Sequence, residues 1–246
     1  MTPVLPKEWQ RPLTERGLNA RRVRGLVRDA YCGTGTHAVY PLDVSRVFRA
    51  FSYAKPDEVR VVILGQDPYY AHPEQADGLA FSVPRLDASV PAEVRFPPSL
   101  QTIFANLTID DQLAFAPPTD GGAPVGDLRG WAKQGVLLLN AALTVSQGAP
   151  GSQNERWREF TDLLIGILND QQAPIAFMLW GKDAQSRARL VSAPHAVFPM
   201  PHPAQPAQKN KSSAWRSGRK LPFSDVNGFL RSTAREPIDW CRTSIV

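Results

Sequence analysis

Cysteine and long apolar runs are scarce in this 246-residue chain. Its two cysteines, Cys32 and Cys241, lie far apart and lack the paired spacing of a zinc site or a redox motif. No stretch approaches the roughly 20 uninterrupted apolar residues of a membrane span, and the N-terminus lacks the apolar segment of a secretory signal. We therefore expect a cytoplasmic protein that uses no metal and contacts no membrane.

Two common catalytic motifs and one sign of charge are also missing. Neither GxSxG nor GxxxxGK[ST] occurs, which argues against a hydrolase nucleophile elbow and a P-loop. Acidic residues are absent between Pro201 and Ser224. The basic residues of this segment are Lys209, Lys211, Arg216, Arg219 and Lys220. With a net charge of +5 and a pI of 9.4, this run favours a polyanionic partner, although a solvated loop has the same pattern.

Apolar residues make up 43% of the chain, enough for a single compact domain over 1–246. Short apolar runs with the length of buried strands lie at 59–64, 136–139, 175–180 and 196–200. Their apolar residues are nearly continuous and do not alternate with polar ones. This pattern is typical of a parallel sheet that is covered on both faces.

The segments between the four apolar runs have the periodicity of helices. Apolar residues at helical offsets predict helices over 100–107 and 157–168, with Ser99 placed to cap the first of them. A third helix is expected over 127–135, and the Pro- and Gly-rich segment 117–126 is expected to be a surface loop. The alternation predicts a three-layer α/β/α fold with a central four-stranded parallel sheet.

Polar residues follow each predicted strand. They are Gln66 and Asp67 after the first strand, Asn140 after the second, Lys182 after the third and His202 after the fourth. Ligands of open parallel sheets bind beyond the carboxyl ends of the strands, so these side chains are expected to converge. Each of them alone is more typical of a helix cap or a turn. An acid and a histidine without a nucleophilic serine or cysteine favour attack by water.

Several segments resemble the main family of uracil-DNA glycosylases, in the order in which that family has them. The sequence GQDPYY at 65–70 and the sequence GLAFS at 78–82 resemble its water-activating and base-stacking segments. Further similar segments are the proline-rich loop at 97–99, the uracil-recognition segment at 131–144, the Gly-Ser loop region at 179–185 and the C-terminal segment at 236–240. The resemblance covers approximately residues 59–240.

The resemblance implies a hydrolase that acts on N-glycosyl bonds. It would flip uracil out of DNA and release the free base, leaving an abasic site in the first step of base-excision repair, with no cofactor. Asp67 would orient the attacking water and stabilise the cationic sugar. His202 would donate a hydrogen bond to uracil O2 as negative charge develops on the leaving base.

The resemblance also implies four residues that bind the uracil. Phe81 would stack on the ring, and the Asn140 amide would donate to O4 and accept from N3–H, which rejects cytosine. Tyr69 would occupy the space of a C5 methyl group and exclude thymine, while Gln66 would act mainly through its backbone.

The implied DNA contacts include two departures from the family. Lys182 stands where a serine is common, and Pro206 stands at the nominal position of the leucine that the family inserts into the minor groove. The implied DNA-binding residues are Pro98, Ser99, Gly181, Lys182, Pro206, Lys209, Lys211 and Arg216. We hypothesise that the basic run compensates for the missing leucine, with Trp215 as a substitute wedge. The alternative is a preference for single-stranded DNA.

The implied partners are uracil-containing DNA and a DNA-mimicking protein inhibitor, and the protein is expected to act as a monomer. Two other functions stay open at this point. One is a DNA-binding protein that recognises uracil or another lesion with little cleavage, which the altered wedge favours. The other is a small-molecule hydrolase that uses the same acid and histidine, against which the basic run counts.

Overall fold

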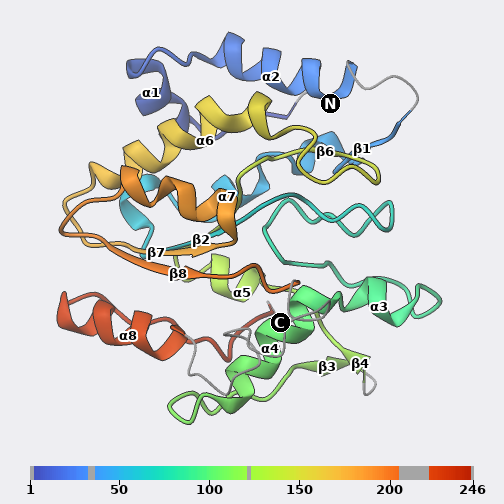
Figure 1. Cartoon of the computed structure of the whole chain (residues 1–246), viewed down its shortest axis with the longest axis vertical. Helices are drawn as coiled ribbons and strands as arrows, with labels where there is room; N and C mark the ends of the chain where they lie inside the picture. Colours follow the sequence, from blue (N-terminus) through green and yellow to red (C-terminus); the bar gives the residue numbers. More distant parts are fainter. Residues whose placement is uncertain (1–2, 33–36, 121–122, 205–221, 245–246) are drawn as a thin grey trace.

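A four-stranded parallel sheet forms the centre of the computed structural model, which describes residues 3–32, 37–120, 123–204 and 222–244 (Figure 1). The strand order is β5-β2-β7-β8. The strands are β2 (Val61–Gly65), β5 (Val136–Asn140), β7 (Ala176–Trp180) and β8 (Ala196–Met200). Each of the four predicted apolar runs overlaps one of these strands, so the expected parallel sheet is confirmed.

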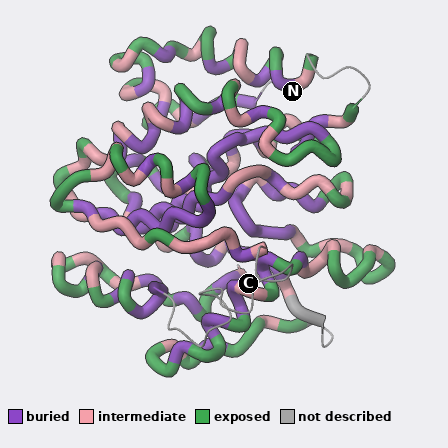
Figure 2. The backbone as a smooth tube through the Cα atoms, in the orientation of Figure 1, coloured by how far each residue is buried: buried purple, intermediate pink, exposed green. Residues whose placement is uncertain are grey.

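Helices cover both faces of the sheet because successive residues of each strand point to opposite sides. Val62 and Leu64 belong to one apolar cluster, whereas Val61 and Ile63 belong to a second. The first face carries α1 (Lys7–Glu15), α2 (Ala20–Cys32) and α6 (Asn154–Asn169), and the second carries α4 (Pro98–Ile109), α5 (Arg129–Ala132) and α8 (Phe223–Ser232) (Figure 1). Figure 2 shows the sheet between these layers, with β2, β5 and β7 buried and the edge strand β8 only partly buried, and the predicted three-layer architecture is confirmed.

Short elements surround this core. The short helices are α3 (Ala92–Arg95), α7 (Lys182–Gln185), η1 (Val44–Arg46), η2 (Arg49–Ser52), η3 (Pro56–Glu58) and η4 (Ser186–Leu190). There are also two antiparallel strand pairs among the described residues: β1 (Val39–Tyr40) pairs with β6 (Val145–Ser146), and β3 (Thr119–Asp120) pairs with β4 (Ala123–Pro124). Among the described residues, no helix combines the length and the apolar character needed to cross a bilayer.

Three local predictions were wrong. The segment 117–126 contains the β3–β4 pair, which the bond from Val125 N to Pro118 O (2.9 Å) extends, so it is not a plain loop. Ser99 does not cap α4: the N-cap is Pro97, and Pro98 occupies the first helical position, where a missing N–H costs nothing. The helix expected over 127–135 is only the four-residue α5, because the chain continues after Ala132 in tighter turns, with Gln134 N bonded to Trp131 O and Gly135 N bonded to Ala132 O.

An aromatic cluster packs beneath the sheet around Trp240, whose side chain is 1% exposed. Its ring lies 5.1 Å from the rings of both Trp131 and Phe223, in edge-on geometry. Trp240 Nε1 donates to Phe223 O (3.1 Å), and the Trp240 carbonyl accepts from Trp131 Nε1 (2.9 Å). The C-terminal segment therefore closes the second face of the core.

We expect Trp240→Ala to lower the free energy of unfolding by about 3–5 kcal/mol, because it leaves a cavity and removes one of these hydrogen bonds. Chemical denaturation measures this change. Ile109→Ala is the control, since its side chain is 57% exposed at the end of α4 and its loss should change stability by no more than about 0.5 kcal/mol. Equal small losses in both variants would contradict the role of the cluster.

Candidate active site

The end of β2 lies against the end of β5, where Gly65 is in register with Asn140. A Cβ at position 65 would lie 2.8 Å from Asn140 Oδ1 and 3.0 Å from the Phe81 ring. Any larger residue would push these groups away. Glycine at this position therefore lets a buried amide and an aromatic ring meet at the carboxyl edge of the sheet.

Asp67 follows β2 and is held by a loop from another part of the chain. Its Oδ2 accepts the backbone N–H of Gly151 at 2.7 Å. Its Oδ1 is buried and has no hydrogen-bond partner among the described residues. Gly151 adopts φ +79°, a conformation that favours glycine. One carboxylate oxygen is thus anchored, and the other is left for a ligand.

The environment of Asp67 makes its ionised form costly. Burial raises the pKa of Asp67 to about 6, the Gly151 N–H lowers it, the nearby Asp183 carboxylate raises it and the Gln66 amide lowers it. Desolvation outweighs the hydrogen bonds because a carboxylate loses more hydration than they return. Asp67 therefore changes charge close to neutral pH, which suits a group that exchanges protons with water.

Phe81 faces Asn140 across the same edge with an unusual backbone. Its φ is +65°, which a residue other than glycine seldom adopts. The residue is 7% exposed, and the centre of its ring lies 5.0 Å from that of Trp180 and 5.8 Å from that of His202. The ring of Phe81 therefore forms an aromatic surface between the amide and the histidine.

Tyr69 stands beside Phe81 with its hydroxyl held at two points. Its Oη lies 2.5 Å from Ser99 Oγ and donates weakly to Phe81 O at 3.5 Å. Burial raises the pKa of Tyr69, so the phenol stays neutral. Since the Ser99 side chain is buried and engaged with Tyr69, its hydroxyl faces the protein interior, and Pro98 beside it is exposed.

His202 lies after β8 and is a neutral hydrogen-bond donor. Burial lowers its pKa, and Nδ1 accepts the backbone N–H of Ala204 at 3.2 Å. The ring proton is consequently on Nε2. Gly181, with φ +92°, permits close packing here, because a Cβ would lie 3.2 Å from His202 Cβ.

An open pocket of about 240 Å³ lies at the carboxyl ends of β2, β7 and β8. It is lined by Gln66, Trp180, Gly181, Lys182, Asp183 and His202. Lys182 and Asp183 are exposed at the start of α7 and give its mouth one charge of each sign. The arrangement combines a carboxylate that can hold water, a neutral imidazole donor, an amide and an aromatic face, which suits hydrolysis of a bond to a planar polar ring.

Comparison with known proteins decides the family. A profile described as the Uracil DNA glycosylase superfamily matches residues 51–225, more than half of the chain. The chain belongs to this superfamily. A protein named uracil-DNA glycosylase from Anoxybacillus flavithermus is 39% identical over 240 residues, which are 97% of this chain and 93% of that protein.

Two further superfamily relatives extend the comparison. A protein named uracil-DNA glycosylase from Desulfitobacterium hafniense is 42% identical over 206 residues, 83% of each chain. A solved mimivirus UNG variant, in complex with UGI, has a TM-score of 0.75 and 25% identity, covering 97% of this chain and 89% of that one.

The structure describes most of the predicted site residues of this superfamily member. Gln66, Asp67, Tyr69, Phe81, Asn140 and His202 lie at the carboxyl edge of the sheet, with Gly181 and Lys182 beside them. Pro98 and Ser99 begin α4. The predicted DNA contacts at Pro206, Lys209, Lys211 and Arg216, and the wedge hypothesis for Trp215, lie outside the described residues.

Sequence reasoning missed three residues that complete the site. Gly151 holds Asp67, Trp180 packs against Phe81, and Asp183 raises the pKa of Asp67. Trp180 carried a signal, since it ends a predicted strand. Nothing local marked Gly151, because its role depends on a hydrogen bond across 84 residues.

The raised pKa predicts a pH-dependent gain in stability for Asp67→Asn. The native state binds the Asp67 proton more tightly than the unfolded chain does, so the stability this provides is complete below about pH 4 and is lost as the pH rises through about 6. Above that range the ionised group destabilises the fold. Asp67→Asn should therefore raise Tm at pH 8 and lose this advantage towards pH 4.

Thermal unfolding at both pH values measures the difference. Asp57→Asn serves as control because Asp57 is exposed, so the substitution removes no buried carboxylate and should not raise Tm at pH 8. An Asp67→Asn variant that is less stable than the parent at pH 8 would contradict the desolvation argument.

Proposed function

We propose that this chain hydrolyses the N-glycosidic bond of uracil in DNA, releasing free uracil and leaving an abasic site, the first step of base-excision repair. The supporting observation is the buried Asp67 Oδ1, which has no partner among the described residues. Asp67 directly follows Gln66, which lines the pocket together with the neutral Nε2 donor of His202. Family membership supports the same activity.

Asp67 acts on the sugar side of the reaction. The C1′–N1 bond breaks with its electron pair moving to the base, and the sugar becomes cationic. The Asp67 carboxylate stabilises that cation and orients a water molecule, whose oxygen bonds to C1′. With a pKa of about 6, Asp67 is ionised at neutral pH and still basic enough to receive the proton of that water.

His202 acts on the base side. Uracil leaves as an anion, and negative charge collects on O2. The Nε2–H of His202 donates to that oxygen, and its donor is preorganised because Ala204 N–H occupies Nδ1. A neutral histidine keeps this donor without placing a second charge in the buried site.

Three side chains select the base. Phe81 stacks on the ring, and Asn140 donates to O4 and accepts from N3–H, whereas cytosine presents the opposite pattern. A site built on such polar contacts discriminates by about 10⁴ to 10⁵. The Tyr69 ring, held through Ser99 and Phe81, occupies the space of the thymine methyl group.

DNA binds along the same edge. The exposed Pro98 and Lys182 and the backbone at Ser99 and Gly181 approach phosphates, and the net charge of +5 favours the polyanion. The solved mimivirus relative with UGI supports a protein inhibitor that competes for this surface. We further propose that the protein acts as a monomer in the cytoplasm.

Incubation with matched oligonucleotides tests the function. Uracil-containing DNA should release free uracil, thymine-containing DNA should not, and exhaustive chelation should leave the rate unchanged. Asp67→Asn should bind the DNA but lose turnover by about 10³-fold or more, since the variant keeps the shape and loses the charge. Binding without release by the parent protein would support the alternative of a lesion-binding protein.

The pocket residues predict two changes of specificity. Asn140→Asp should admit cytosine, because a protonated carboxyl group pairs with the reversed edge, and Tyr69→Ala should admit thymine. Release of each base from matched oligonucleotides measures the change, with uracil release as the control for intact catalysis. Variants that still release uracil and reject both other bases would contradict the assigned pocket.

A further inference from the structure

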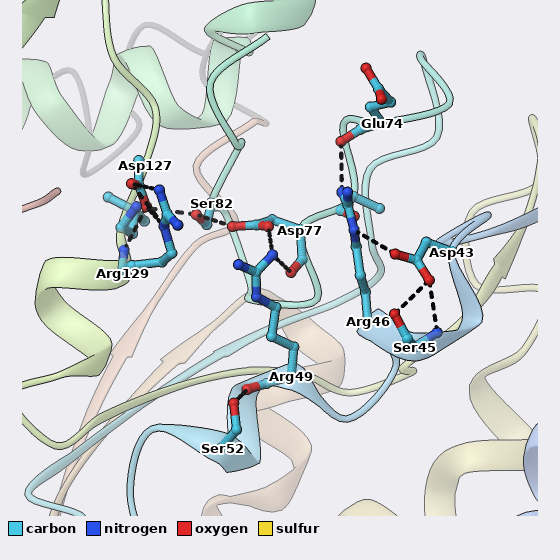
Figure 3. Close-up of polar contacts among 12 residues, drawn as sticks. Asp43, Ser45, Arg46, Arg49, Ser52, Glu74, Asp77, Ser82, Asp127 and Arg129 are labelled. Carbon is cyan, nitrogen blue, oxygen red and sulfur yellow. Dashed lines mark hydrogen bonds and ion pairs between the residues drawn. The ribbon is translucent and has the colours of Figure 1, made fainter. Parts of the chain in front are cut away.

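Two arginines hold the segment that precedes Phe81 (Figure 3). Arg46 ends η1 and donates through Nη1 to the carbonyls of Glu74 (3.2 Å) and Ala76 (3.4 Å). Arg49 begins η2, pairs with the Asp77 carboxylate and donates to the Asp77 carbonyl at 3.4 Å. The backbone from 74 to 77 is therefore tied to the two 3₁₀ helices.

Asp77 is the centre of this contact network. Its side chain is completely buried, whereas that of Arg49 is 29% exposed. Ser82 Oγ donates to Asp77 Oδ2 at 3.3 Å and accepts the backbone N–H of Leu128 at 3.1 Å. The buried carboxylate thus joins η2 on one side, through Arg49, to the start of α5 on the other, through Ser82 (Figure 3). Phe81 directly precedes Ser82 in the chain.

The turn between Asp77 and Ser82 needs such support. Gly78 has φ +76°, and a Cβ there would lie 2.1 Å from the Arg46 carbonyl oxygen. Phe81 has φ +65° with a full aromatic side chain. Residues in this conformation persist only where their surroundings hold them. Contacts on both sides of the turn come from the Arg49–Asp77–Ser82 chain of bonds.

We propose that Arg49 and Asp77 are positioning residues that hold Phe81 in the left-handed conformation in which its ring receives the base. The proposal rests on the proposed function, since it assigns Phe81 to base stacking. Neither residue lines the pocket beside His202, so both act through the 78–82 turn. Asp67 and His202 stand on other segments, and the pair therefore governs base binding more than the chemical step.

Arg49→Met tests this proposal, because it removes the ion pair and keeps most of the apolar stem. We expect KM for a uracil-containing oligonucleotide and the inhibition constant of free uracil to rise roughly tenfold, with kcat within about threefold, as partial loss of base stacking predicts. Arg49→Lys keeps the charge and should give an intermediate rise. Unchanged constants in folded Arg49→Met would overturn the proposal.

The matched control is Arg16→Met. Arg16 is also 29% exposed and also forms an ion pair, with Asp170 at the end of α6, so its loss tests what any such pair contributes to stability. Both variants should lose some stability, but only Arg49→Met should alter KM. If KM rose equally in Arg49→Met and Arg16→Met, the rise would reflect a general loss of stability, which would contradict a positioning role.

A double-mutant cycle shows whether Arg49 acts through Phe81. Phe81→Ala removes the stacking ring, so adding Arg49→Met should change KM by less than about twofold further. A full additional rise would mean that Arg49 acts by another route, which overturns the proposal.

Amide hydrogen exchange provides a readout that needs no activity. Ala80 N–H bonds to Leu138 O at 3.0 Å and Ser82 N–H to Leu79 O at 3.3 Å, and both should exchange faster in Arg49→Met than in Arg16→Met. If the parent protein released no uracil, the proposed function would be wrong. The amide exchange rates would still show whether Arg49 supports the 78–82 turn. Unchanged exchange would refute the positioning role.

Discussion

The parallel pairing of β2 with its two neighbours is the constraint on which the rest of the site depends. Because β2 lies between β5 and β7, its end at Gly65 meets Asn140 on one side and approaches Trp180 on the other. The absence of a side chain at Gly65 then leaves room for Phe81. A carboxylate, an amide and an aromatic ring from distant parts of the chain can therefore share one small space.

The same burial that organises the site also destabilises it. Asp67 is ionised at neutral pH in surroundings that favour its neutral form, and the backbone N–H of Gly151 and the Gln66 amide offset part of the cost. His202 shows the complementary case, since burial favours its neutral form and a backbone N–H selects the tautomer. Desolvation thus raises the pKa of Asp67 and lowers the pKa of His202. Packing of the surrounding core offsets the stability that is lost by burying the ionised acid.

Support for the site extends well beyond the residues that face the pocket. Tyr69 is held by Ser99 of α4, and the Phe81 turn is held by Asp77, whose partners come from η2 and from the turn itself. Each support is a polar group inside an apolar shell, where a missing partner would be costly. Several separate segments therefore hold the proposed base pocket, and local propensity alone would not produce its geometry.

The sequence by itself determined the sheet, the three layers and the polar residues at the strand ends, because apolar runs this short favour strands and their continuity requires a sheet covered on both faces. It also carried the family resemblance, through ordered segments such as 65–70 and 135–140. It misjudged Ser99, the length of α5 and the β3–β4 pair, where short-range propensities are weak and tertiary contacts decide. Only the tertiary structure revealed Gly151 against Asp67 and Arg49 against Asp77, since such bonds join positions 84 and 28 residues apart, and no local pattern encodes a contact across that separation.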